Sequence, residues 1–232
     1  MILSIVIPAT LAEELFAMRM RMRKKPNLVP RMEKCTDVLI DDPAALMGCW
    51  MESYPGYDNL FLELGCGKGR FTAETARREP KNLLIAVEKV PDAMVVAMER
   101  VCELGLKNAR FIDGDALALP VIFAENEVDR IYINFCDPWP RKKEAKHRLT
   151  SPTFLSIYEN ILKPSGEIHF KTDNQPLFEY SVETLQAEGW EILELTRDLH
   201  AQGPVGVMTD YETKFWEQGI KINKLTARRA GK

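Results

Sequence analysis

The residues "NLFLELGCGKGRF", 59–71, carry the pattern from which the fold of this chain is predicted. Its first six residues are mostly apolar and predict a buried strand. Gly65, Gly67 and Gly69 follow directly, and glycines at such a place let the backbone turn tightly and pass close to a ligand. Residues 70–79 then show the periodicity of a helix. A strand, a glycine-rich turn and a helix in this order are typical of the ligand-binding edge of an α/β sheet.

The rest of the chain continues this alternation of short apolar runs and amphipathic runs. We predict further strands at 83–88, 109–112, 129–135 and 167–172, helices at 91–104, 151–162 and 175–188, and two final strands at 190–196 and 213–222. Strands and helices that alternate at this spacing predict a parallel sheet with right-handed crossovers. Ligands bind such sheets at the carboxyl ends of the strands, so the residues that follow each strand are the candidate site.

Composition limits the class of protein. The 232 residues are 46% hydrophobic and 28% charged, which suits one compact domain. We place it at 36–232, after an N-terminal extension and basic segment at 1–35 that could be flexible. No apolar run is long enough to span a membrane. Five cysteines without a CxxC pair favour a reducing, cytoplasmic compartment, and three scattered histidines suggest no metal site.

The net charge of −3 conceals three basic segments. Residues 19–34 sum to +6, residues 141–148 to +4 and residues 221–232 to +5. Basic segments on an acidic body fit a local contact with a polyanion, although the two terminal segments could equally be solvated tails. The first 17 residues make a poor signal peptide. A methionine just after them could serve as the start, so we expect them to be a non-essential extension.

The glycine turn favours a cationic ligand. A nicotinamide fingerprint would place a third glycine where Arg70 stands, whereas here Glu63 comes just before the turn. A carboxylate at that point suits S-adenosylmethionine, which carries an ammonium and a sulfonium and no phosphate. Glu88 ends the second strand and can accept both hydroxyls of a ribose. Asp115, after the third strand, is placed to bind an adenine amino group, and Asp113 competes for that role.

The stretch "INFCDPWPRKKEAKHR", residues 133–148, holds an acid, an aromatic residue and a basic cluster. Asp137 follows the fourth strand, and Pro138 favours an extended conformation for it, so its carboxylate should lie beside the cofactor. We expect Trp139 to pack on the core. The basic residues, in a connecting loop, can meet phosphates, which position a nucleic acid without reading its sequence. The alternative is a solvated loop.

Two later segments offer polar groups at the same edge. Asp173 ends the fifth strand, where it could also cap the helix that follows. Thr209, Tyr211 and Glu212, just before the last predicted strand, could donate or accept hydrogen bonds with a base. From the residues alone this second assignment is weak.

The motifs together resemble the bacterial tRNA (guanine-N7-)-methyltransferases, which are class I methyltransferases. The matching pieces are "LELGCGKG", "IAVEK", "GDA", "NFCDPWPRKKEAKHRL", "LKPSGEIHFKTDN" and "MTDYETKF", in order from about 59 to 220. The resemblance implies a Rossmann-like fold with a mainly parallel sheet and a C-terminal antiparallel strand. It also implies methylation of the guanine at position 46 in the variable loop of tRNA.

The resemblance assigns roles by motif match. Asp137 would be the active-site acid. The cofactor-binding residues would be Glu63, Gly65, Gly67, Glu88, Asp115 and Asp137. The guanosine would be held by Arg141, Asp173, Thr209, Asp210, Tyr211 and Glu212. The RNA would be contacted by Lys143, Glu144, Ala145, Lys146, His147 and Arg148. Arg141 stands where such enzymes commonly have lysine, and the two side chains are not interchangeable.

Three other functions are open. "NFCDPWP" is reminiscent of the motif of exocyclic-amino methyltransferases, although Trp139 departs from it. A nicotinamide-dependent oxidoreductase is disfavoured by Glu63 and Arg70. A non-catalytic RNA-binding protein would leave the glycine turn unexplained. The partner expected on the main interpretation is tRNA, without membrane or metal, and either a monomer or a homodimer fits.

Overall fold

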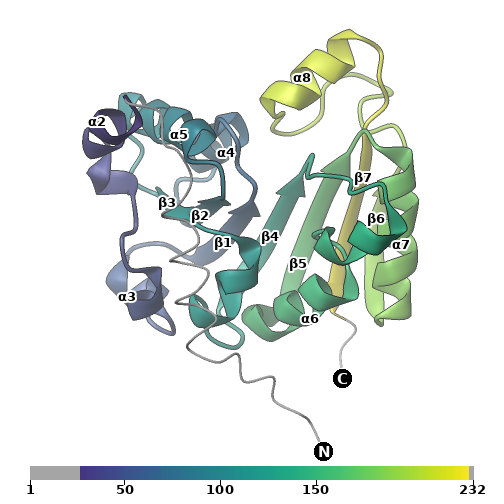
Figure 1. The fold of residues 1–232 in the computed structure, drawn as a ribbon, viewed down its shortest axis with the longest axis horizontal. Helices are drawn as coiled ribbons and strands as arrows, with labels where there is room; N and C mark the ends of the chain where they lie inside the picture. Colours follow the sequence, from purple (N-terminus) through teal and green to yellow (C-terminus); the bar gives the residue numbers. More distant parts are fainter. Residues whose placement is uncertain (1–26, 230–232) are drawn as a thin grey trace, which may run out of the picture.

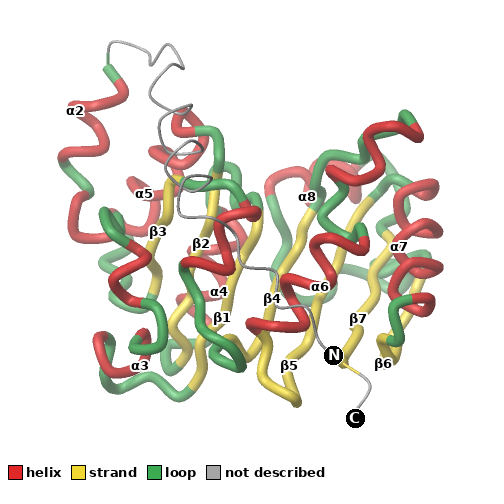
Figure 2. The backbone as a smooth tube through the Cα atoms, turned by 60° about the horizontal axis from the view of Figure 1, so that its bottom comes forward, coloured by secondary structure: helices red, strands yellow, loops and turns green. Residues whose placement is uncertain are grey.

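The computed structural model describes residues 27–229, and in this part of the chain seven strands form one sheet. Their order across the sheet is β3-β2-β1-β4-β5-β7-β6, and Figure 2 shows them side by side. The strands are β1 (Asn59–Leu64), β2 (Asn82–Glu88), β3 (Ala109–Asp113), β4 (Val128–Asn134), β5 (Leu162–Thr172), β6 (Trp190–Thr196) and β7 (Asn223–Arg229).

Helices connect the strands and cover both faces of the sheet. They are α2 (Leu28–Glu33), α3 (Trp50–Ser53), α4 (Arg70–Arg78), α5 (Pro91–Glu103), α6 (Pro152–Ile161), α7 (Gln175–Ala187) and α8 (Asp210–Glu217). Short 3-10 helices are η1 (Thr36–Val38), η2 (Pro43–Leu46), η3 (Ala116–Val121) and η4 (Lys142–His147). Figure 1 shows α8 at the end of the sheet toward which the arrows of β1 and β4 point.

The strand directions confirm the predicted fold class. Strands β1 to β5 pair in parallel, and β7 is antiparallel to both of its neighbours, β5 and β6. Chain order therefore reverses beside β1, because β1 lies between β2 and β4. In open α/β sheets such a reversal leaves a crevice at the carboxyl ends of the strands.

The alternation of side chains along β1 explains how the two layers form. Leu60, Leu62 and Leu64 point into the larger core with α3, η3, α6 and α7. Phe61 points to the other face, where it packs with Phe71 of α4. Since successive residues of a strand face opposite sides, Glu63 also points toward α4. The acid just before the glycine turn is thus directed to one defined face of the sheet.

Two predicted elements are wrong. No strand forms at 213–222: residues 213–217 belong to the helix α8, and the last strand begins only at Asn223. Thr209 caps α8, and Glu212 completes a capping box, so two otherwise unpaired backbone N–H groups of the first turn are satisfied. The basic stretch after "DPWP" is not a plain loop, because it contains η4.

Parts of both terminal segments lie outside the residues that the structure describes. Residues 1–26, which include the expected extension at 1–17 and half of the basic segment at 19–34, are outside the described residues, as are 230–232. Within 27–35, α2 packs on α5, and the Arg31 Nε donates to Glu99 at 2.7 Å. The domain boundary at 36 remains a prediction.

The C-terminal basic segment is paired within the protein. Lys221, Lys224, Arg228 and Arg229 each form an ion pair with a nearby carboxylate. The described part of this segment therefore contributes to the packing of β7 more than to a free basic surface. No helix between residues 27 and 229 has the length and apolar character that crossing a bilayer requires.

Candidate active site

The glycine turn brings the ends of β1 and β2 together. Gly69 has φ +71° and is the N-cap residue of α4, and a Cβ at this position would lie 2.3 Å from the Cβ of Ala97 on α5. Only glycine allows both this backbone conformation and this contact between helices. The N–H of Gly67 donates to the Glu88 carboxylate at 2.8 Å. The turn is thereby fixed against the carboxyl end of the neighbouring strand.

Glu63 is a buried acid beneath this turn. Its side chain accepts a hydrogen bond from Thr72 Oγ1 at 2.6 Å and one from Asn134 Nδ2 at 3.4 Å, and the residue is 1% exposed. Burial raises the pKa of Glu63 to about 7, because desolvation disfavours the charged form more than these hydrogen bonds favour it. A cation placed here would favour the carboxylate. Sequence reasoning missed Thr72 and Asn134, since nothing local links them to Glu63.

Glu88 and Asp115 follow the next two strands. The Glu88 carboxylate accepts from the N–H groups of Gly67 and Val90, both at 2.8 Å. Asp115 is exposed and accepts from the N–H of Leu117 at 3.0 Å, so it also caps η3. Asp113, the alternative to Asp115, is half-buried at the end of β3 and pairs in register with Glu88. Glu88, Asp113 and Asp115 therefore lie at one edge of the sheet.

Asp137 lies at the same edge and is open to solvent. Its side chain is 67% exposed, and its Oδ2 is 3.6 Å from the Nζ of Lys89, which follows β2. The loop that carries it is unusual, because Phe135 and Trp139 both have positive φ, at +53° and +43°. Non-glycine residues with such backbone angles are uncommon and concentrate at functional sites. Sequence reasoning did not find Lys89 as the neighbour of Asp137.

Trp139 differs from the prediction. It is half-buried and does not join the hydrophobic core; its ring lies 5.2 Å from that of His147, and the Lys89 ammonium lies 5.9 Å from the ring centre. Its positive φ turns the side chain away from the path that an extended loop would give it. Trp139 therefore lies between the strand-end lysine and the basic turn.

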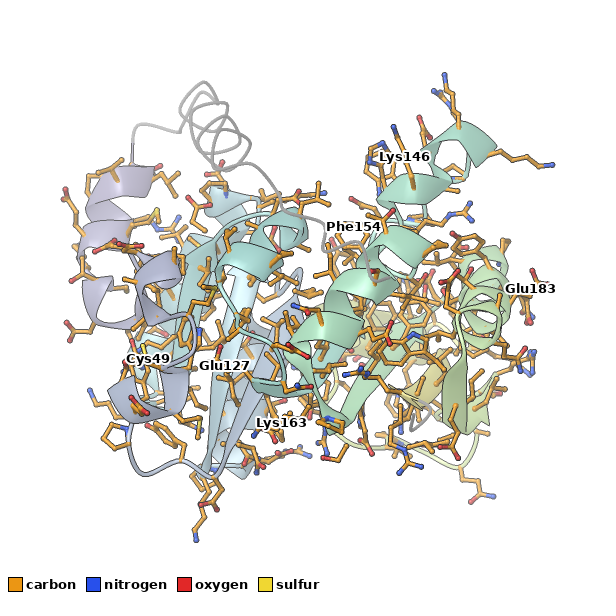
Figure 3. All side chains as sticks on the ribbon, turned by 90° about the horizontal axis from the view of Figure 1, so that it is seen from below. Cys49, Glu127, Lys146, Phe154, Lys163 and Glu183 are labelled. Atoms are coloured by element: carbon orange, nitrogen blue, oxygen red, sulfur yellow. The ribbon has the colours of Figure 1, made fainter. Side chains whose placement is uncertain are left out.

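The basic turn η4 presents most of its cations to solvent. Arg141, Lys142, Lys143, Lys146 and His147 are exposed, whereas Glu144, Ala145 and Arg148 are half-buried. Figure 3, in which Lys146 is labelled, shows this turn at the opposite end of α6 from Lys163. Glu144 forms an ion pair with Arg141 at 3.5 Å. The exposed cations thus begin at Arg141, after Pro138, Trp139 and Pro140 of the loop that carries Asp137.

Of the residues Thr209–Glu212, at the start of α8, some side chains are buried and others are exposed. Glu212 is completely buried: it accepts from Lys171 Nζ at 2.6 Å and from His200 Nε2 at 3.0 Å. His200 Nδ1 accepts the N–H of Val205, so the ring proton lies on Nε2. Burial lowers the pKa of Lys171, and the adjacent Glu212 opposes this effect.

The other residues predicted around the guanosine are nearer the surface. Thr209 is half-buried as the cap of α8, and Tyr211 is 64% exposed. Asp210 forms ion pairs with Arg100 at 3.3 Å and Arg70 at 3.8 Å, beside a cavity of about 350 Å³. Asp173 is exposed at the end of β5, and Asn174 rather than Asp173 caps α7.

No metal centre accompanies these acids in the described residues. Among residues 27–229, no group of three or more His, Cys, Asp or Glu side chains has the arrangement that would hold a metal ion.

Solved structures of methyltransferases share this fold. The chain is similar to a 16S rRNA methyltransferase, KamB, with 17% identity, a TM-score of 0.59 and coverage of 75% of this chain and 89% of that one. It is also similar to a 16S rRNA adenine methyltransferase from Catenulisporales acidiphilia solved with its cosubstrate SAM, with 15% identity, a TM-score of 0.57 and coverage of 82% and 92%. The fold is that of the Rossmann-like methyltransferases.

Sequence comparison identifies the family. A family model described as "Putative methyltransferase" matches residues 58–225. A tRNA (guanine-N(7)-)-methyltransferase from Bacillus cytotoxicus is 41% identical over 210 residues, which are 90% of this chain and 97% of the relative. The protein is a methyltransferase, and it belongs to the tRNA (guanine-N7-)-methyltransferase family.

Proposed function

We propose that this protein transfers a methyl group from S-adenosylmethionine to nitrogen 7 of the guanine at position 46 in the variable loop of tRNA. The observation that carries the proposal is the position of an exposed acid between buried acids and a group of cations. The exposed Asp137 carboxylate stands at the sheet edge with Glu63 and Glu88, and the exposed cations of η4 follow it directly. An acid beside the cofactor region and a phosphate-binding surface next to it suit methylation of a nucleic-acid base.

The residues present fit S-adenosylmethionine. A buried carboxylate with a raised pKa, a glycine turn and two further strand-end acids suit a cationic ligand that carries a ribose. Glu63 would meet the cationic end, Glu88 the ribose hydroxyls and Asp115 the adenine. Gly65 and Gly67 would let the backbone approach. When bound, S-adenosylmethionine supplies an electrophilic methyl group on its sulfonium.

The chain's own task is alignment and charge stabilisation. Nitrogen 7 of guanine is a hydrogen-bond acceptor with a free lone pair, so it can attack without a general base. Holding the base in line with the methyl group therefore supplies much of the rate enhancement. Methylation moves positive charge onto the guanine, and the exposed Asp137 carboxylate would stabilise that charge.

Two groups of side chains would hold the RNA. Tyr211, Asp173 and Arg141 are exposed and can contact the guanosine, Arg141 in the role that lysine has in similar enzymes. Thr209 and Glu212 would act on the base only indirectly, because their side chains fasten α8. The exposed side chains of Lys143, Lys146 and His147 would meet phosphates. We place the activity in the cytoplasm, in line with the five free cysteines.

The experiment that tests the function is methyl transfer from labelled S-adenosylmethionine to unmodified tRNA, followed by digestion to nucleosides and identification by mass. We expect 7-methylguanosine from the wild type and a loss of about a hundredfold or more in turnover for Asp137→Asn. Asp58→Asn, an exposed acid just before the start of β1, is the matched control. Label in an N-methylated exocyclic amine would overturn the choice of target atom, and unchanged turnover in Asp137→Asn would overturn the role of that acid.

A further inference from the structure

Arg148 differs from every other cation of the segment 141–148. It is half-buried, and its guanidinium points back at the loop that carries Asp137. Its Nε donates to the carbonyl oxygen of Pro138 at 3.1 Å, and its Nη2 donates to that of Trp139 at 2.9 Å. A longer contact of 3.3 Å joins Nε to the Trp139 oxygen. The guanidinium thus bridges two consecutive carbonyl groups directly after the proposed active-site acid.

A second contact fixes the guanidinium from the other side. Its central carbon lies 4.2 Å from the centre of the Tyr180 ring on α7, which is the geometry of a cation–π contact. The neighbouring residues of both segments also meet, since Thr150 Oγ1 and Ser181 Oγ are 2.7 Å apart in a buried hydrogen bond. Arg148 therefore links the loop to a helix that is itself packed on the sheet.

The loop needs such a support. Trp139 has φ +43°, a conformation that costs a bulky L-residue on the order of 1 kcal/mol or more. Strained backbone persists only where the surroundings determine it. Hydrogen bonds from a charged donor are about twice as strong as neutral ones, and both carbonyls that Arg148 contacts flank this strained residue.

We propose that Arg148 is a positioning residue for the methyl transfer: it holds the backbone at Pro138 and Trp139, and through it the Asp137 carboxylate, instead of contacting a tRNA phosphate. The inference rests on the proposed function for its catalytic consequence, but the mechanical role is independent of it. A planar guanidinium can donate to two carbonyls while its face lies on a ring, whereas an ammonium acts as a compact point charge.

The decisive experiment compares Arg148→Gln and Arg148→Lys with Lys146→Gln, a cation of the same turn that is exposed. We expect both Arg148 variants to lower kcat at least tenfold while tRNA Kd and the slope of log Kd against log salt concentration stay at the wild-type values. Lys146→Gln should instead weaken tRNA binding and reduce that slope by about 0.7 to 0.9. A phosphate contact at Arg148 would give the opposite pattern: Arg148→Gln would reduce the slope and Arg148→Lys would restore it. That pattern overturns the proposal.

A second readout does not depend on activity. Amide hydrogen exchange of the peptide covering 133–141 should become faster in Arg148→Gln, because the loop loses its support. Unchanged exchange there would overturn the positioning role even if tRNA proved to be the wrong substrate. If the Arg148 variants do not fold, Tyr180→Leu gives the answer: it removes the ring under the guanidinium and no charge, so it should lower kcat and leave the salt slope unchanged. Wild-type kcat in folded Tyr180→Leu would contradict the inference.

Discussion

The buried ion pair between Lys171 and Glu212 gives the sharpest prediction for stability. The two side chains are 10% and 0% exposed, and Nζ lies 2.6 Å from Oε2. The pair joins β5 to α8 across 41 residues of sequence. Removing one partner from a buried pair leaves an uncompensated charge and typically costs about 3–5 kcal/mol. That is a large fraction of the roughly 5–15 kcal/mol by which a domain is stable.

The perturbation is Glu212→Gln, which keeps the shape of the side chain and removes its charge. The Lys171 ammonium would then face an amide and the carbonyl of Val207, with little solvent to compensate. We expect a loss of about 3–5 kcal/mol in the free energy of unfolding, measured by urea denaturation. For a chain of this length each kcal/mol corresponds to about 2–4 °C, so Tm should fall by about 6–20 °C.

A double-mutant cycle isolates the pair. Lys171→Met should also destabilise strongly, whereas the double variant Lys171→Met/Glu212→Gln should recover part of the loss because no buried charge is left alone. Glu194→Gln, which breaks the more exposed pair with Lys224, is the control and should cost about 1 kcal/mol or less. If Glu212→Gln costs no more than this control, or if the double variant shows no recovery, the pair does not fasten α8 as we argue.

Three further predictions concern the sheet edge and the core. The pKa of Glu63 is raised to about 7 from an ordinary 4.5. Its contribution to the free energy of unfolding is therefore fully present below about pH 4.5 and is lost as pH rises through 7. This contribution is about 3 kcal/mol. Glu63→Gln should remove the corresponding change of the free energy of unfolding with pH, measured by urea denaturation between these pH values. Gly69→Ala should cost about 2 kcal/mol or more in thermal unfolding, since its Cβ would overlap Ala97, whereas Gly105→Ala, with φ +65° but open space, should cost only about 1–2 kcal/mol. Trp50→Phe should cost about 2–3 kcal/mol, because it leaves a buried carbonyl oxygen without the indole N–H at 3.0 Å and opens a cavity; a change below 1 kcal/mol would contradict this.

Local signals were sufficient for most of the architecture. Apolar runs and helix periodicity predicted β1, β2 and α5 to within a residue or so, because each element carries its own pattern. The error at 213–222 has a local explanation. Thr, Tyr, Phe and Trp in this region favour a strand by propensity, but the capping box of Thr209 and Glu212 was the stronger signal for a helix.

The candidate site was predictable only where it follows from topology. Parallel strands bring their carboxyl ends to one edge, so Glu63, Glu88 and Asp137 could be grouped from their positions after strands. The side chains that contact these acids could not be predicted in this way. Lys89 beside Asp137, and Asn134 beside Glu63, are set by the twist and packing of neighbouring strands, which no local pattern records.

The order of the elements, the glycine turn and the acids at the strand ends could therefore be predicted, because they depend on residues close together in the chain. Which side chains face inward is known only from the folded protein. Glu212 and Arg148 both stand in segments that the resemblance assigns to RNA binding, yet Glu212 is buried against Lys171 and Arg148 donates to the carbonyls of Pro138 and Trp139. The direction of a charged side chain depends on which distant groups can compensate it, and those groups meet only when the chain has folded.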